Sequence, residues 1–169
     1  MLTPREHLDI FYDFKGGDPD PAKKETEIDQ LLTDVDLKHK SASLGHELSG
    51  GQKRKLSAAM SFIGGSKLII MDEPTSSLDL SARRLLWTML KKYKKDRIVL
   101  LTTHYMDEAD ILGDRIGVMA EGRISALGTS LFLKKTFSLG FKLDIVKNDS
   151  KENEEVLKFC RLNLGPNCR

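Results

Sequence analysis

Apolar residues at helical spacing predict a helix near the start of the chain. In "LTPREHLDIFYDFKGG" (2–17), Thr3 is placed to cap a helix that begins at Pro4, Glu6 completes a capping box, and the two glycines end the helix. Three apolar residues recur at every third position, so we expect them on the inward face of this helix: Leu8, Phe11 and Phe14.

Two more helices are expected before residue 66. The first begins at Pro21, after the turn "DPDP", and carries four apolar residues inward: Ile28, Leu31, Leu32 and Val35. The second begins at "LSGGQ" (48–52) and ends at Gly64–Gly65. Glycine costs a helix about 1 kcal/mol relative to alanine, so Gly50 and Gly51 in a first turn need a reason. Access is such a reason, because a glycine-lined helix N-terminus lets an anion approach bare backbone N–H groups.

After residue 66 the pattern changes to short, continuous apolar runs. "KLIIM" (67–71) shows no alternation, which is typical of a strand covered on both faces. A helix is expected from about residue 81 to residue 95, followed by a second buried strand, "RIVLLT" (97–102). Strand, helix and strand in this order predict a βαβ unit with a parallel sheet.

The rest of the chain is expected to hold a hairpin and three short elements. The hairpin covers "RIGVMAEGRISALG" (115–128), with Glu121–Gly122 at its turn. The other elements are a helix over 130–137, a strand over 141–146 and a polar helix over 151–161.

Composition and charge exclude several function classes. The 169 residues include 27 basic and 25 acidic side chains, a net charge of +2, without the strongly basic face of a nucleic-acid-binding protein. The longest apolar runs are far shorter than the roughly 20 residues of a membrane-spanning helix, and no signal peptide is visible. Cys160 and Cys168 predict no disulfide, and the four histidines have no metal-ligand spacing, so we expect a soluble, cytosolic chain.

Candidate chemistry lies at the ends of the two buried strands. Asp72 and Glu73 follow the first strand and His104 follows the second, so all three are expected at one edge of the sheet, where ligands bind. One carboxylate could hold Mg²⁺ through water while the other orients or deprotonates a water that attacks a phosphate, with the histidine at the γ-phosphate. The plainer alternatives are a solvated "DEP" turn and a histidine that makes only structural hydrogen bonds.

The order and spacing of these motifs resemble a known family. "LSGGQ" (48–52), "IIMDEPTSSLD" (69–79) and "LLTTH" (100–104) are similar to the second half of an ATP-binding-cassette (ABC) nucleotide-binding domain. Flanking stretches such as "HYMDEADILGDRIGVMAEGRISALG" resemble the A subfamily, whose members are mostly lipid exporters or flippases. Leu80 departs from the proline that the family usually has after the D-loop.

The resemblance implies a role for each motif. Asp72 would be the Walker B aspartate that holds Mg²⁺ through water, Glu73 the catalytic glutamate and His104 the switch histidine. The signature motif would bind, in trans, the γ-phosphate of an ATP held by a second nucleotide-binding domain; its residues are Leu48, Ser49, Gly50, Gly51 and Gln52. The D-loop residues are Ser76, Ser77, Leu78 and Asp79.

The fold class that follows is α/β, a partial P-loop NTPase-type ABC ATPase fold. We divide it into a helical subdomain with the signature motif (1–65), the C-terminal part of the α/β ATPase core (66–128) and the start of an A-subfamily regulatory extension (129–169). The resemblance implies ATP and Mg²⁺ as cofactors and a second nucleotide-binding domain and transmembrane domains as partners. It places the chain at the cytoplasmic face of a membrane, within a lipid transporter.

One motif of the family is missing from the sequence. No stretch matches the P-loop G-x-x-x-x-G-K-[ST], whose backbone cradles the β-phosphate; Gly45 and Gly50 have the first spacing, but the lysine does not follow. Two explanations stay open: a fragment of a longer transporter, which the intact Glu73 and His104 favour, or a short protein that acts as a regulatory or interaction module. In both cases we expect the isolated chain to be inactive as an ATPase.

Overall fold

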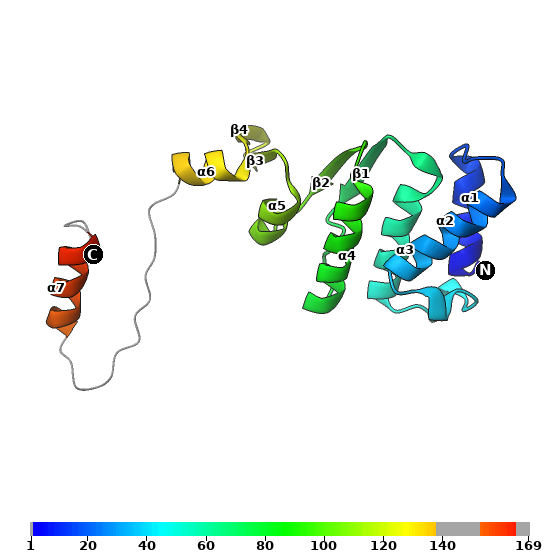
Figure 1. Ribbon diagram of the computed structural model, residues 1–169, viewed down its shortest axis with the longest axis horizontal. Helices are drawn as coiled ribbons and strands as arrows, with labels where there is room; N and C mark the ends of the chain where they lie inside the picture. Colours follow the sequence, from blue (N-terminus) through cyan, green and yellow to red (C-terminus); the bar gives the residue numbers. More distant parts are fainter. Residues whose placement is uncertain (1, 138–152, 165–169) are drawn as a thin grey trace. The chain divides into compact units, whose positions relative to one another are not determined.

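The computed structural model describes residues 2–137 and 153–164, and these divide into two units, one that ends at Leu133 and one that begins at Lys134. All the candidate site residues lie in the first unit. The helices and strands in chain order are α1 (Pro4–Phe14), α2 (Pro21–Asp34), α3 (Gly50–Phe62), β1 (Leu68–Asp72), α4 (Leu80–Tyr93), β2 (Ile98–Thr102), α5 (Met106–Leu112), β3 (Ile116–Ala120), β4 (Arg123–Gly128), α6 (Ser130–Phe137) and α7 (Asn153–Leu164) (Figure 1). The expected strand over 141–146 lies outside the described residues.

Helices α1, α2 and α3 begin where the sequence predicts, and α1 ends before the expected glycine pair, whereas α3 ends at Phe62 and continues as a 3₁₀ turn to Gly65. Thr3 and Glu6 form the expected capping box at α1, and the inward residues of α2 are all buried. The expectation for Phe14 is wrong, because its side chain is 88% exposed and Tyr12 packs into the core instead. Each step of three residues falls about 60° short of a full helical turn, so Phe14 rotates away from Leu8, whereas Tyr12 stays on its face.

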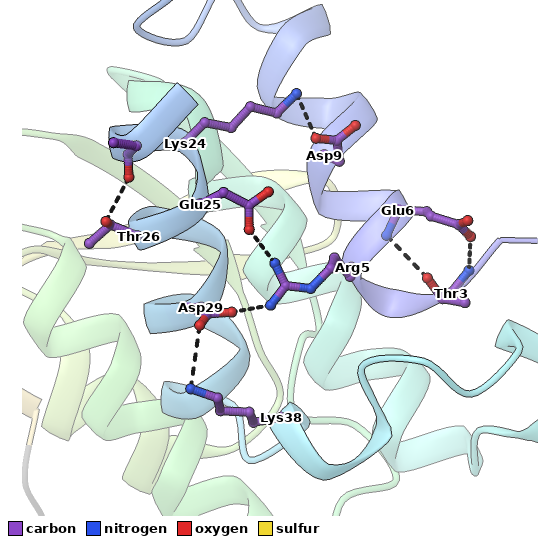
Figure 2. Close-up of polar contacts among 10 residues, drawn as sticks. Thr3, Arg5, Glu6, Asp9, Lys24, Glu25, Thr26, Asp29 and Lys38 are labelled. Atoms are coloured by element: carbon purple, nitrogen blue, oxygen red, sulfur yellow. Dashed lines mark hydrogen bonds and ion pairs between the residues drawn. The ribbon is translucent and has the colours of Figure 1, made fainter. Parts of the chain in front are cut away.

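Ion pairs join α1 to α2 across their exposed sides (Figure 2). Arg5 donates to Glu25 at 2.5 Å and to Asp29, and Lys24 Nζ lies 2.6 Å from an oxygen of Asp9. A single exposed ion pair contributes only about 0–1 kcal/mol. Acting together they fix the relative orientation of two helices that both pack against α3.

Strands β1 and β2 are paired in parallel and joined by α4, which confirms the predicted βαβ unit. The expectation that β1 is covered on both faces is wrong for the described residues. Ile69 and Met71 are buried in the core that α3 and α4 share, whereas Leu68 and Ile70 are 59% and 66% exposed. Alternate side chains of a strand point to opposite faces, so one apolar face of this two-stranded sheet lies open.

The elements after β2 comprise a helix that the sequence did not predict and a hairpin that it did. Helix α5 (Met106–Leu112) follows β2 within the segment "MDEADIL". Strands β3 and β4 are antiparallel, and the turn residues Glu121 and Gly122 have φ of 50° and 72°, as a tight hairpin turn requires. Helices α6 and α7 agree with the expected elements at 130–137 and 151–161. Across residues 2–137 and 153–164, none of the helices is both long and apolar enough to cross a membrane.

Candidate functional site

The carboxyl ends of β1 and β2 place the acidic pair beside Thr102. Asp72, the last residue of β1, is aligned with Thr102, whose hydroxyl donates to Asp72 Oδ1. Glu73 leaves the strand with a φ of 43°, and its N–H lies 3.1 Å from both the carbonyl and the hydroxyl oxygen of Thr102. These contacts fix the point at which both carboxylates leave the sheet.

Glu73 and His104 are in direct side-chain contact. Glu73 Oε1 lies 3.0 Å from His104 Nδ1, and the two side chains are 45% and 56% exposed. A proton on Nδ1 makes the imidazole the donor of this bond and leaves Nε2 facing away from the carboxylate. The pair therefore offers a carboxylate that can accept a proton from water, and an imidazole whose Nε2 donates to an anion when both ring nitrogens carry a proton.

The donors at this edge suit Mg²⁺. A magnesium ion in an ATPase site is commonly bound through one or two carboxylates, several waters and phosphate oxygens. Asp72 and Glu73 supply carboxylate oxygens at an exposed edge, and within the described residues no group of three or more metal ligands forms a closed cage. Asp72 would hold such an ion at the edge of the sheet.

The signature motif forms the N-terminus of α3. Ser49 caps the helix reciprocally with Gln52: Gln52 N–H donates to Ser49 Oγ at 3.2 Å, and Ser49 N–H donates to Gln52 Oε1 at 2.9 Å. The first backbone bond of the helix runs from Lys53 to Ser49, so the N–H groups of Gly50 and Gly51 precede it. A Cβ added at Gly50 would meet nothing within 4 Å. Packing within the chain does not require this glycine, whereas an approaching anion would benefit from it.

The signature motif and the D-loop line one surface groove of about 600 Å³. Its lining includes Ser49, Gly51 and Gln52 from the signature and Ser77, Leu78 and Asp79 from the D-loop. Gly51 lies close enough to the D-loop that an added Cβ would stand 3.3 Å from Leu78 Cδ2. Asp79 caps α4 by accepting a hydrogen bond from the Ala82 N–H, and this bond is the main cause of the lowered pKa of Asp79.

The predicted residues thus lie in two places: Asp72, Glu73 and His104 at the edge of the sheet, and most signature and D-loop residues along the groove. Leu48 and Ser76 belong to neither place. Leu48 is buried and packs in the core, so its side chain contributes packing to the signature loop. Ser76 lies between the two places, and its N–H donates to the Glu73 carbonyl oxygen. Arg54 of α3 donates to the same oxygen at 3.2 Å, which joins the signature helix to the acidic edge.

Glu108 is a residue of this region that was not expected from the sequence. This α5 residue is fully buried and accepts hydrogen bonds from Thr75 and Trp87. A helical interpretation of "MDEADIL" would have placed Glu108 in the first turn, but no pattern marks it as buried. Arg54 was likewise not among the expected site residues, because a basic residue within the run "KRK" (53–55) resembles an ordinary solvated helix position.

Comparison with known proteins identifies relatives along most of the chain. The ABC transporter family model matches residues 1–76. The chain is 45% identical over 150 residues to human ATP-binding cassette sub-family A member 2, covering 89% of this chain and 6% of that protein. It is 44% identical over 146 residues to the bovine retinal-specific phospholipid-transporting ATPase ABCA4 (86% and 6%) and 43% identical over 155 residues to the human phospholipid-transporting ATPase ABCA3 (92% and 9%). The chain therefore spans less than a tenth of the length of these relatives.

Solved structures share the fold. An ATP-binding subunit of an ABC transporter matches with a TM-score of 0.71 and 29% identity, covering 82% of this chain and 57% of that one. A dimeric ATP-binding cassette, MJ0796, in a post-hydrolysis state with ADP and Pi, matches with a TM-score of 0.67 and 23% identity, covering 76% and 57%. The described elements are therefore those of an ABC ATPase domain.

Proposed function

We propose, because this chain belongs to the A subfamily of the ABC transporters, that it forms part of an ATP-hydrolysing nucleotide-binding domain. The observation that carries the proposal is the Glu73–His104 contact beside Asp72, at the ends of two paired strands. A carboxylate with an imidazole partner is a suitable base for a water that attacks a phosphate.

Each residue of the edge has its own task in this proposal. Glu73 orients the attacking water and takes its proton, while His104 contacts the γ-phosphate and holds the Glu73 carboxylate. Asp72 holds Mg²⁺ through water. Mg²⁺, when bound, supplies the positive charge that offsets repulsion between the acidic pair and the phosphate oxygens.

The signature loop serves a second ATP in the same proposal. Ser49 and the N–H groups of Gly50 and Gly51 bind the γ-phosphate of a nucleotide held by a partner nucleotide-binding domain. The open space at Gly50 and the anion-binding character of a helix N-terminus support this role. The D-loop beside it would line the same interface.

The relatives suggest what the ATP is used for. Two of them are described as phospholipid-transporting ATPases, and we extend this activity to the protein to which this chain contributes. The chain would then sit at the cytoplasmic face of a membrane, in contact with transmembrane domains.

A chimera tests the proposal. Residues 1–133 of this chain replace the matching residues of the bovine ABCA4 relative, and steady-state ATPase activity is measured in membranes. We expect an active chimera in which Glu73→Gln lowers kcat by about 10²–10⁴-fold with little change in KM, because the change removes a base and little binding energy. The isolated chain, which has no P-loop sequence, should hydrolyse no ATP.

Two results of this experiment would contradict the proposal. An inactive chimera that is folded and reaches the membrane would point to the interaction module instead. Full activity in the Glu73→Gln chimera would make Glu73 a structural residue. Asp114→Asn, at an exposed carboxylate just after α5 that pairs with Lys94, is the matched control and should leave activity unchanged.

A further inference from the structure

Glu108 is a buried carboxyl group bound by two other elements. Its side chain is fully buried, and Thr75 and Trp87 are 1% and 7% exposed. Thr75 Oγ1 donates to Glu108 Oε2 at 3.0 Å, and Trp87 Nε1 donates to Oε1 at 2.9 Å. Each carboxyl oxygen thus has one donor, as a buried polar group requires.

The three residues come from the elements that carry or support the Glu73–His104 pair. Thr75 lies two residues after Glu73, in a turn closed by the bond from Leu78 N–H to the Thr75 carbonyl oxygen. Glu108 lies four residues after His104, in the first turn of α5, where Ala109 N–H bonds to the Tyr105 carbonyl oxygen. Trp87 belongs to α4.

These links close a ring. The backbone connects Glu73 to Thr75, and Thr75 is hydrogen-bonded to Glu108. The backbone of the first turn of α5 connects Glu108 to His104, and His104 contacts Glu73. Within the ring the Thr75–Glu108 bond is buried, whereas the His104–Glu73 contact is about half exposed. Water competes freely for the exposed contact and hardly at all for the buried one.

The loop that carries Glu73 needs such support. Glu73 and Ser77 both have positive φ, 43° and 63°, a conformation that residues other than glycine adopt only when surrounding structure holds them there. Thr102 holds the start of this loop and Asp79 caps the helix that follows it. The middle of the loop is held at Thr75 by Glu108.

We infer that Glu108 is a positioning residue: its carboxyl group ties the Glu73 loop and the His104 loop to α4 and so maintains the Glu73–His104 contact. A role of Glu108 in catalysis rests on the proposed function, whereas its role in maintaining the Glu73–His104 contact does not. Glu108 itself touches neither water nor substrate, so it acts only through the two residues that it aligns.

The test uses the whole 169-residue chain, isotope-labelled, and the ring C–H signals of its histidines in NMR spectra. A His104→Asn variant assigns the His104 signals, and Glu73→Gln gives the displacement that loss of the carboxylate causes. We expect Glu108→Ala to move the His104 signals in the same direction by at least half as much, and to leave the distant His7 signals in place. Because Trp87 is the single tryptophan, its fluorescence reports independently on the loss of its partner.

Two further variants separate positioning from general stability. Glu108→Gln keeps an oxygen for the Trp87 N–H and an amide that can donate to Thr75 Oγ1, so it should restore the His104 signals toward the wild type. Asp114→Ala removes a carboxylate that is 85% exposed and pairs with Lys94, beyond the end of α5, and should leave the His104 signals in place. If Glu108→Ala does not fold, Thr75→Val, which keeps the side-chain shape and removes the donor, takes its place with the same expected shift.

The inference is overturned if a folded Glu108→Ala or Thr75→Val variant keeps the wild-type His104 signals while Trp87 fluorescence or thermal stability changes. That result would make Glu108 a residue of the core only. None of these measurements involves nucleotide, so their outcome is distinct from that of the chimera. In an active chimera, Glu108→Ala should lower kcat with KM unchanged, and Glu108→Gln should restore it.

Discussion

At the scale of single residues, two cations hold the C-terminal end of α3. Lys15 Nζ donates to the carbonyl oxygens of Met60 and Ser61, both at 2.8 Å, and Arg97 donates to that of Phe62 at 2.8 Å. Burial, and then the neighbouring Arg97 charge, lower the pKa of Lys15. Positive charge at this end complements the helix dipole, so the helix that presents Gly50 and Gly51 at its other end is anchored firmly.

Replacing Lys15 tests this anchoring. Lys15→Met keeps most of the apolar stem and removes the ammonium, which leaves two carbonyl oxygens without their donor. We expect the free energy of unfolding to fall by about 1–3 kcal/mol, measured by urea denaturation followed through Trp87 fluorescence. Lys95→Met, at an exposed lysine of the α4–β2 connection, is the control and should change it by less than about 0.5 kcal/mol. Equal effects of the two changes would contradict the anchoring role.

At the scale of elements, Asp34 joins α2 to α4. Its Oδ2 accepts from Lys92 Nζ at 2.6 Å and from Tyr93 Oη at 2.7 Å, at the end of α2 farthest from Pro21. Burial alone would raise the pKa of Asp34, but donation by Lys92, Tyr93 and Gln30 outweighs it and the pKa is lowered. The charged form is therefore favoured by folding.

The lowered pKa predicts how stability depends on pH. A carboxyl group with a lower pKa in the folded chain stabilises it above the ordinary aspartate pKa, and this contribution is lost as pH falls through the folded value. Asp34→Asn should therefore reduce the free energy of unfolding by about 2 kcal/mol near pH 7, and the difference from the wild type should narrow in acid. Denaturation series at several pH values check this, with the exposed Asp36→Asn as control. A difference that stays constant with pH would contradict the charge argument.

The elements also show where sequence reasoning works and where it stops. Local signals predicted the capping box at Thr3, the glycine-containing first turn of α3 and the hairpin turn at Glu121, because each depends on a few neighbouring residues. The edge that joins Asp72, Glu73 and His104 followed from strand order alone. Glu108 could not be found in this way, because its burial depends on Thr75 and Trp87, which are distant in the sequence and approach only when α4 and α5 pack.

At the scale of the whole molecule, the open face of the β1–β2 sheet is the main unsatisfied feature of the described residues. Four large side chains are more than half exposed on these strands: Leu68, Ile70, Ile98 and Leu100. Exposed apolar strands promote association between chains. This chain covers 57% of each of the two solved structures, and we expect further elements of such a domain to cover the face.

Polar substitutions on this face distinguish its exposure here from its burial in a longer domain. In the isolated chain, Ile70→Thr with Leu100→Thr should raise the monomer fraction in sedimentation velocity and leave the circular dichroism spectrum unchanged, since threonine is β-branched and therefore suits a strand. In the chimera with the bovine relative the same pair should lower stability by about 2–5 kcal/mol, as truncation of buried apolar side chains does. Ile69→Thr, at a buried position, should destabilise both proteins. If the double variant does not lower the stability of the chimera, the face is exposed in the longer domain too, and the expectation that further elements cover it is wrong.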